Sequence, residues 1–196
     1  MGAVVVVVLA VAPRGAAAAP AADIPVARVP ALKVRVLAPE AGATPLAGAT
    51  PLLMPVFGVS ANELVDTYTQ ARSGGRTHNA IDIRAARGTP VIAAVDGVIR
   101  KIFTSRAGGL TLYQFDVNEE RVYYYAHLDG YADGIGEGLF VKAGTVLGYV
   151  GTTGNAPPDT PHLHFAVEVL PPTKEWWKGE PVNPYPLLTT RVSALP

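Results

Sequence analysis

Residues 160–169 read TPHLHFAVEV, and this stretch predicts a β-strand that carries two of the four histidines in the chain. Successive side chains of a strand point to opposite faces. His162 and His164 would therefore share one face, while Leu163 and Phe165 would point into an apolar core. The pattern indicates a strand with one packed face and one face available for chemistry, although two histidines also occur on ordinary polar strand faces.

Two further segments place the remaining histidines beside predicted strands. Residues 77–83 read THNAIDI, so Asp82 alternates with two isoleucines and follows His78 by four positions. A loop histidine followed by a strand carboxylate suits a metal site, because Zn²⁺ binds both ligand types; a solvated edge carboxylate is the alternative. His127 ends the run YYYAH over 123–127, so we expect it where a strand runs out into a loop. Such positions often carry function, but a surface histidine remains possible there.

The rest of the chain predicts short strands joined by turns. Residues 88–102 hold Asp96 and Gly97 between two apolar runs, which is the pattern of a β-hairpin. Other β-rich runs occupy residues 110–117, 121–126 and 140–150. Strands at such short spacing predict an all-β fold, built as an antiparallel sheet or sandwich of hairpins.

The composition limits the possible functions. With 196 residues, of which 49% are apolar and 16% charged, the chain can bury a substantial core. Its formal net charge is zero and it has no basic runs, which argues against a nucleic-acid partner. It contains no cysteine, so disulfides and thiolate metal sites are excluded. Any metal would have to be held by histidine and carboxylate.

The amino-terminal part of the chain predicts segments outside the folded domain. An apolar run followed by an alanine block is typical of a secretory signal peptide, expected over residues 1–22. The run is shorter than the roughly 20 residues that span a bilayer, so no membrane segment is expected after signal removal. Residues 23–53 predict a Pro/Ala-rich linker, residues 54–190 the folded domain and residues 191–196 a tail. The mature protein is expected in the periplasm or outside the cell.

Together these segments resemble the lysostaphin/LytM-type zinc metallopeptidases, which cleave the cross-links of peptidoglycan. The resemblance covers residues 55–188, and its anchors are the segments 75–83, 88–91, 125–128, 146–154 and 161–165. It implies that His78, Asp82 and His164 bind zinc, and that His127 and His162 are catalytic histidines without a bond to the metal. The implied fold is a sandwich of hairpins similar to a duplicated hybrid motif, with the metal site in a groove on one sheet face.

The implied reaction is hydrolysis of a peptide bond. Three protein ligands leave the fourth position of Zn²⁺ to water, and a catalytic zinc lowers the pKa of that water to about 7. One free histidine would accept a proton and pass it to the leaving amine, while the other would stabilise the oxyanion. The sequence does not assign these two roles. Tyr68 and Arg76 are weaker candidates for substrate contact.

Two positions depart from the family pattern. Ala80 stands where glycine is common, which would cost about 1 kcal/mol if the backbone there required a positive φ. Ala166 stands where an acidic residue is common, and Glu168 lies two positions further on. In the carboxy-terminal part, Trp176 and Trp177 form either an exposed platform or a packed pair.

Two other functions remain open. Some members of the family lack zinc ligands and act as cell-wall binding modules that activate separate amidases, and a complete candidate ligand set argues against that role. A phosphocarrier with two histidines would share a hairpin-rich sandwich, but the apolar amino terminus argues against a cytoplasmic carrier. The expected partners are the peptide stems of peptidoglycan, and the protein is expected to be a monomer.

Overall fold

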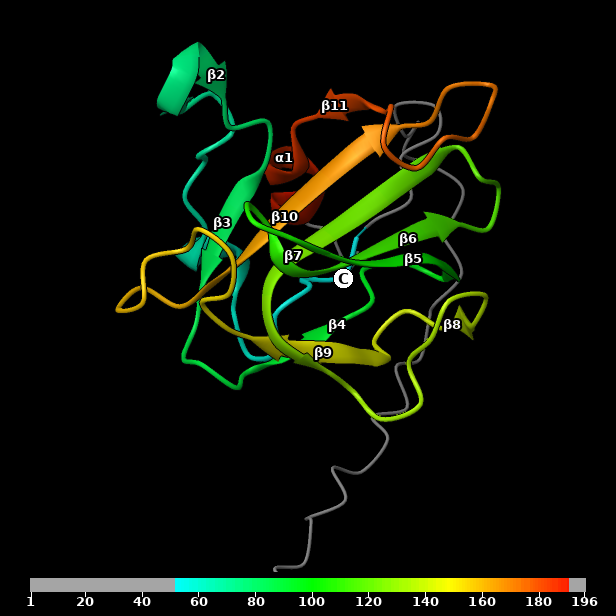
Figure 1. The fold of residues 1–196 in the computed structure, drawn as a ribbon, viewed down its shortest axis with the longest axis horizontal. Coiled ribbons are helices and arrows are strands. Elements are labelled where there is room, and N and C mark those ends of the chain that lie inside the picture. Colours follow the sequence, from blue (N-terminus) through cyan, green and yellow to red (C-terminus); the bar gives the residue numbers. More distant parts are fainter. Residues whose placement is uncertain (1–51, 191–196) are drawn as a thin grey trace, which may run out of the picture. The chain divides into compact units, whose positions relative to one another are not determined.

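The computed structural model describes residues 52–190, which form an almost entirely antiparallel β structure (Figure 1). The strands are β1 Ala71–Arg72, β2 Arg76–Thr77, β3 Ile81–Arg84, β4 Pro90–Ile92, β5 Gly97–Ser105, β6 Gly109–Asp116, β7 Arg121–Tyr131, β8 Phe140–Val141, β9 Val146–Val150, β10 His162–Val169 and β11 Glu180–Val182. The helical elements are the 3₁₀ turns η1 Ala61–Glu63 and η2 Ser73–Gly75 and the helix α1 Pro184–Thr189. The predicted signal peptide, nearly all of the linker and the tail lie outside the described residues.

One nine-stranded sheet contains every strand except β1 and β2, which form a separate two-stranded ribbon. Its main order is β11-β10-β7-β6-β5-β8, with β3 added to β10 and the β4–β9 pair joined to β7. The first half of β7 pairs with β10, whereas its last residues pair with β9. Figure 1 shows β7 curving between these two groups of strands. The predicted all-β antiparallel fold is therefore confirmed. None of the helices in residues 52–190 has the length and apolarity that crossing a bilayer requires.

The core lies under β10, as its alternating pattern predicted. Leu163, Phe165 and Val167 are fully buried, while His162 and His164 on the opposite face are only partly covered. Ile81 and Ile83 of β3 are also fully buried beside them. Burying a side chain of this size contributes about 1.5–3 kcal/mol to folding. The strand that carries the two histidines is thus firmly anchored on its other face.

A buried polar network supports the chain between β4 and β5. The hydroxyl of Tyr125 donates to Gln114 Oε1 at 2.8 Å and accepts from the backbone N–H of Ala94 at 3.0 Å. The Gln114 amide donates to the Val95 carbonyl at 2.8 Å. These bonds provide hydrogen-bond partners for the buried Ala94 N–H and Val95 carbonyl, which lie between two strands. Buried polar groups are nearly always paired in this way.

The hairpin predicted for residues 88–102 is wrong, although a strand exists on each side of the Asp-Gly pair. β4 pairs with β9, whereas β5 pairs with β6 and β8. The Asp96 carboxylate accepts from the Ala143 backbone N–H and pairs with Lys142, both at 2.8 Å. Gly97 lies so close to β6 that a Cβ there would be 1.9 Å from the Phe115 carbonyl oxygen. At the Asp-Gly pair the chain therefore passes from β4, which pairs with β9, to β5, which pairs with β6 and β8.

Candidate metal centre

Strand pairing brings the candidate residues together. β10 lies between β3 and β7, and His164 is directly opposite Asp82 on β3 and Ala126 on β7. Side chains directly opposite each other in an antiparallel pair lie on the same face with Cβ atoms about 4.5–5.5 Å apart. The register therefore places the Asp82 carboxylate beside the imidazole of His164.

Three ligand atoms converge at this point. His78 Nε2 and His164 Nδ1 lie 3.0 and 3.2 Å from Asp82 Oδ1, and the two nitrogens are 3.0 Å apart. Zinc bonds of about 2.0–2.2 Å in a tetrahedron would separate ligand atoms by about 3.3 Å. Two imidazoles and a carboxylate also match the ligands that zinc takes at catalytic sites. The residues thus fit a zinc ion in both chemistry and spacing.

The orientation of His78 is fixed by backbone contacts around its ring. Its Nδ1 donates to the Thr67 carbonyl at 2.9 Å, which turns Nε2 toward the centre. A metal-binding histidine commonly has its other nitrogen held in this way. The next residue, Asn79, turns the chain into β3 with φ 55°. Ala80 is not among the positive-φ residues, so the cost expected for alanine at that position does not arise.

The second carboxylate oxygen of Asp82 is bound by an arginine that the sequence did not single out. Arg72 Nη2 donates to Asp82 Oδ2 at 2.5 Å, which leaves Oδ1 for the three-atom cluster. Burial raises the pKa of the Asp82 carboxyl, but hydrogen bonds and charge interactions with His164 and His78 outweigh that effect and hold the pKa well below its usual range. Asp82 is therefore an anion at neutral pH.

His127 enters the site from a bulge within β7. The prediction that a strand ends at His127 is wrong, because β7 continues to Tyr131. Leu110 and Leu112 of β6 oppose Leu128 and Tyr125, so one residue of β6 faces two residues of β7. His127 has φ 62° in this bulge, a conformation that is uncommon for residues other than glycine. Bulges re-aim side chains next to active sites, and this one directs the imidazole toward β10.

The two histidines outside the three-atom cluster, His127 and His162, are each held by a hydrogen bond from the ring to a backbone carbonyl. His127 Nδ1 donates to the Thr153 carbonyl and His162 Nδ1 to the Thr160 carbonyl, both at 2.8 Å. Because a carbonyl oxygen only accepts, the hydrogen is on Nδ1 in both rings and Nε2 is left for the site. Their ring centroids are 5.0 Å apart. Burial lowers the pKa of His127 to about 4, although its bond to Thr153 opposes the shift. His127 is therefore neutral at pH 7.

A cleft of about 260 Å³ opens beside His78, His127 and His164, and we call it the histidine cleft; His162 and Asp82 are not part of its lining. It is lined by Arg72, Arg76, Thr77, His78, Ala107, Gly108, Tyr124, Ala126, His127, Asn155 and His164. Arg76, one of the two residues predicted to contact substrate, is part of this lining. Tyr68 is not part of the lining, and its hydroxyl donates to the Pro181 carbonyl of β11 at 3.1 Å.

Sequence reasoning missed Arg72, Tyr124 and Asn155 in this lining. Tyr124 lies two positions before Ala126 and on the same face of β7, but alternation counted from His127 points to Tyr125 instead, because the bulge shifts the alternation by one residue. The Tyr124 ring meets that of His164 edge-on at 5.8 Å between centroids. Arg72 lies in the two-residue strand β1 and Asn155 in a turn, and the alternating pattern describes neither.

The remaining predicted features lie away from the metal cluster. Glu168 is near Gly179, and burial raises the pKa of its carboxyl. Trp176 packs against Tyr113 at 4.6 Å between ring centroids, whereas Trp177 is 57% exposed. The tryptophan pair is therefore neither wholly packed nor wholly a platform.

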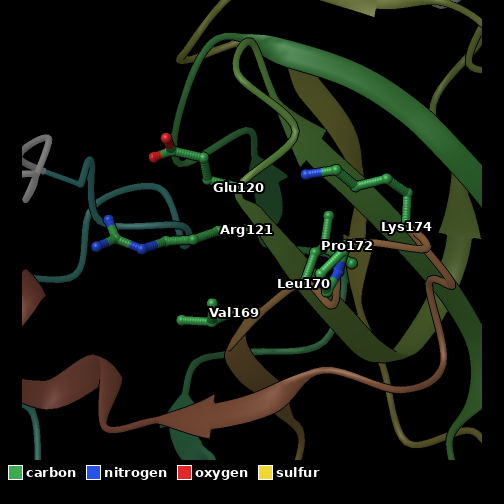
Figure 2. A pocket seen from close by; sticks show the side chains of 6 residues that line it. All are labelled: Glu120, Arg121, Val169, Leu170, Pro172 and Lys174. Atoms are coloured by element: carbon green, nitrogen blue, oxygen red, sulfur yellow. The ribbon is translucent and has the colours of Figure 1, made fainter.

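A second hollow, of about 320 Å³, lies at the other end of β7 and β10 (Figure 2). It is lined by Glu120, Arg121, Val169, Leu170, Pro172 and Lys174. In Figure 2 the side chains of Glu120 and Arg121 extend away from Lys174, whose ammonium donates to the Glu119 carbonyl. Its charged groups do not converge, so this hollow lacks the features of a catalytic site.

Comparisons with known proteins point to one family. The model of peptidase family M23 matches residues 76–184. The chain is 37% identical to the L-Ala–D-Glu endopeptidase of Bacillus subtilis over 129 residues, which are 62% of this chain but only 38% of that protein. The catalytic domain of lysostaphin from Staphylococcus simulans superposes with a TM-score of 0.56 at 28% identity, over 66% of this chain and 96% of that domain. Helicobacter pylori Csd3 gives a TM-score of 0.55 at 27% identity, over 71% of this chain and 35% of that protein.

Proposed function

Because the chain belongs to peptidase family M23, we propose that residues 54–190 are the catalytic domain of a zinc-dependent endopeptidase that hydrolyses peptide cross-links of bacterial peptidoglycan. The observation that carries the proposal is the spacing of 3.0–3.2 Å among His78 Nε2, Asp82 Oδ1 and His164 Nδ1. These three residues would hold the zinc. Two similar proteins, an L-Ala–D-Glu endopeptidase and the peptidase lysostaphin, are named for peptide-bond cleavage, which supports the reaction class.

The zinc would supply Lewis acidity and a water of lowered pKa. His127 is suited to accept the proton of the attacking water, because its ring is neutral and its Nε2 lone pair is left for the site. A positioned acid or base of this kind contributes about 10²- to 10⁴-fold in rate.

His162 is suited to contact the reacting carbonyl or the leaving group. Its Nε2 lies beside the metal cluster, 3.7 Å from Asp82 Oδ1. From there it can donate to the developing oxyanion or to the leaving amine. Arg76 would contact the substrate from the wall of the histidine cleft. Tyr68 is assigned a structural role, because its hydroxyl is engaged by β11.

A binding module that activates a separate amidase is the alternative function. It would need no metal, whereas here the described residues offer a complete His-Asp-His cluster. The proposal is tested by digesting purified peptidoglycan with the purified protein and identifying the released ends by mass spectrometry. New amino termini within the peptides support an endopeptidase. Released intact stem peptides would indicate an amidase instead, and no release together with stimulation of an amidase would establish the binding module.

We also propose that the protein is exported, because its substrate lies outside the cytoplasm and its amino terminus is typical of a signal peptide. The mature chain is expected to begin near Pro20 or Asp23, after removal of the apolar run and the alanine block. Amino-terminal sequencing of native protein from fractionated cells is the measurement. Recovery of the chain from the cytoplasm with Met1 intact would contradict export.

A further inference from the structure

The ribbon of β1 and β2 brings two arginines to the wall of the histidine cleft. Arg72 and Arg76 are directly opposite each other in the antiparallel register, and both line the cleft. Gly74 and Gly75, with φ 76° and 72°, form the tight turn that sets this register. Figure 1 shows the ribbon projecting beyond β3.

Placing two arginines opposite each other would cost free energy if the β1–β2 ribbon stood alone. Like charges directly opposite each other on paired strands are destabilising. The Asp82 carboxylate offsets the charge of Arg72 through the bond at 2.5 Å, but it is also a candidate zinc ligand. Of the described residues that line the histidine cleft, none is Asp or Glu. With a divalent cation bound, the cation and Arg72 would outweigh the single negative charge of Asp82, so this end of the cleft would carry a net positive charge that favours an anionic group of the substrate.

The chemistry of the guanidinium group indicates which anion it favours. A guanidinium presents five N–H donors in a planar fork that matches a carboxylate. The bond to Asp82 uses Nη2 of Arg72, whose side chain is still 38% exposed. Arg72 can thus hold Asp82 and present other donors to the cleft. Arg76 lines the same cleft from the opposite strand of the ribbon and carries a guanidinium of the same chemistry.

We propose that Arg76, assisted by Arg72, binds a free carboxylate of the substrate peptide close to the bond that is cleaved. The inference rests on the proposed function and specifies its substrate class. The substrate would be a peptidoglycan peptide with a free carboxylate near the scissile bond, in contrast to an uncharged oligoglycine bridge. Arg76 is a specificity-determining residue in this account, and Arg72 both positions Asp82 and contributes to the same anion site.

The test compares two forms of one substrate. Cross-linked peptides released from peptidoglycan are used with their carboxylates free, and after chemical conversion of those carboxylates to carboxamides. The unmodified protein is expected to cleave the acid form with a kcat/KM about 10- to 100-fold higher, the range for a hydrogen bond to a charged group. In Arg76→Gln this ratio should fall toward one, mainly because the KM for the acid form rises, while zinc content stays at the unmodified level.

Two further variants distinguish recognition of the carboxylate by the Arg76 guanidinium from a general effect of positive charge. Arg76→Lys keeps the charge but loses the fork, so it should retain only part of the preference. Arg100→Gln removes a charge from β5, outside the cleft lining, and should keep the full preference. Calorimetric binding of both peptide forms to metal-free protein gives a second readout, in which the acid form binds more tightly and Arg76→Gln removes the difference.

The outcomes distinguish this inference from the function on which it rests. Equal cleavage of the acid and amide forms by the unmodified protein would overturn the inference and leave the endopeptidase intact. An unchanged acid preference in Arg76→Gln would overturn the assignment to Arg76. Failure of the zinc-loaded protein to cleave either form would contradict the proposed function, and the inference with it.

Discussion

Replacing His164 with alanine is expected to remove both zinc and peptidoglycan hydrolysis. The substitution deletes one of three candidate ligands and leaves only His78 Nε2 and Asp82 Oδ1, 3.0 Å apart, to hold the ion. Two ligands on a partly exposed surface do not retain a catalytic zinc that normally has three protein ligands. Zinc per chain, measured by elemental analysis, should fall from about one to near zero. Hydrolysis of purified peptidoglycan should fall to background in the same preparation.

The fold should survive this substitution, because His164 lies on the partly covered face of β10 and not in the core. The packed face of the strand, including Leu163 and Phe165, is unchanged. Thermal unfolding of the metal-free unmodified protein and of metal-free His164→Ala is therefore the matched control, and their midpoints should be similar. Full zinc content in His164→Ala would show that this residue is not a ligand.

Substitutions of His162 and His127 should have the opposite pattern, with zinc retained and turnover lost. Neither ring belongs to the cluster of three ligand atoms. Their removal affects proton transfer or oxyanion stabilisation, and the rate of peptidoglycan hydrolysis should fall by about 10²- to 10⁴-fold. Zinc stoichiometry and turnover are measured together for His162→Ala, His127→Asn and the unmodified protein.

Asparagine is the better replacement at position 127 because of the backbone there. His127 has φ 62°, which asparagine tolerates more readily than alanine. A loss of activity in His127→Asn can then be assigned to the missing imidazole, provided that the unfolding midpoint is unchanged. If His162→Ala lost zinc while His164→Ala retained it, the roles of the two histidines on β10 would be reversed.

The alternating pattern of residues 160–169 predicted β10 correctly because burial on one face fixes which side chains point outward. The same rule placed Asp82 on a strand between two buried isoleucines, and both predictions depend only on local alternation. The hairpin at Asp96 and Gly97 was wrong because a local turn pattern does not specify which strand becomes the partner. Pairing of β4 with β9 is decided by contacts between residues more than fifty positions apart.

The position of His127 could be predicted only in part for a similar reason. The run of tyrosines before it predicted a strand, but the bulge that extends β7 to Tyr131 depends on the register with β6. No glycine marks the positive φ at that position. Arg72 was missed because its role arises from the β1–β2 ribbon, in which each strand has only two residues and no alternation can be read. Contacts made by such short elements become visible only in three dimensions.

We propose that the His78, Asp82 and His164 cluster holds a zinc ion on which peptide hydrolysis depends. The most direct measurement is the rate of peptide-bond cleavage in purified peptidoglycan, followed by mass spectrometry before chelation, after chelation and after zinc is returned. We expect about one zinc per chain at the start, loss of cleavage together with loss of zinc, and recovery of both on zinc addition. Full cleavage by protein that elemental analysis shows to contain no metal would contradict the proposal.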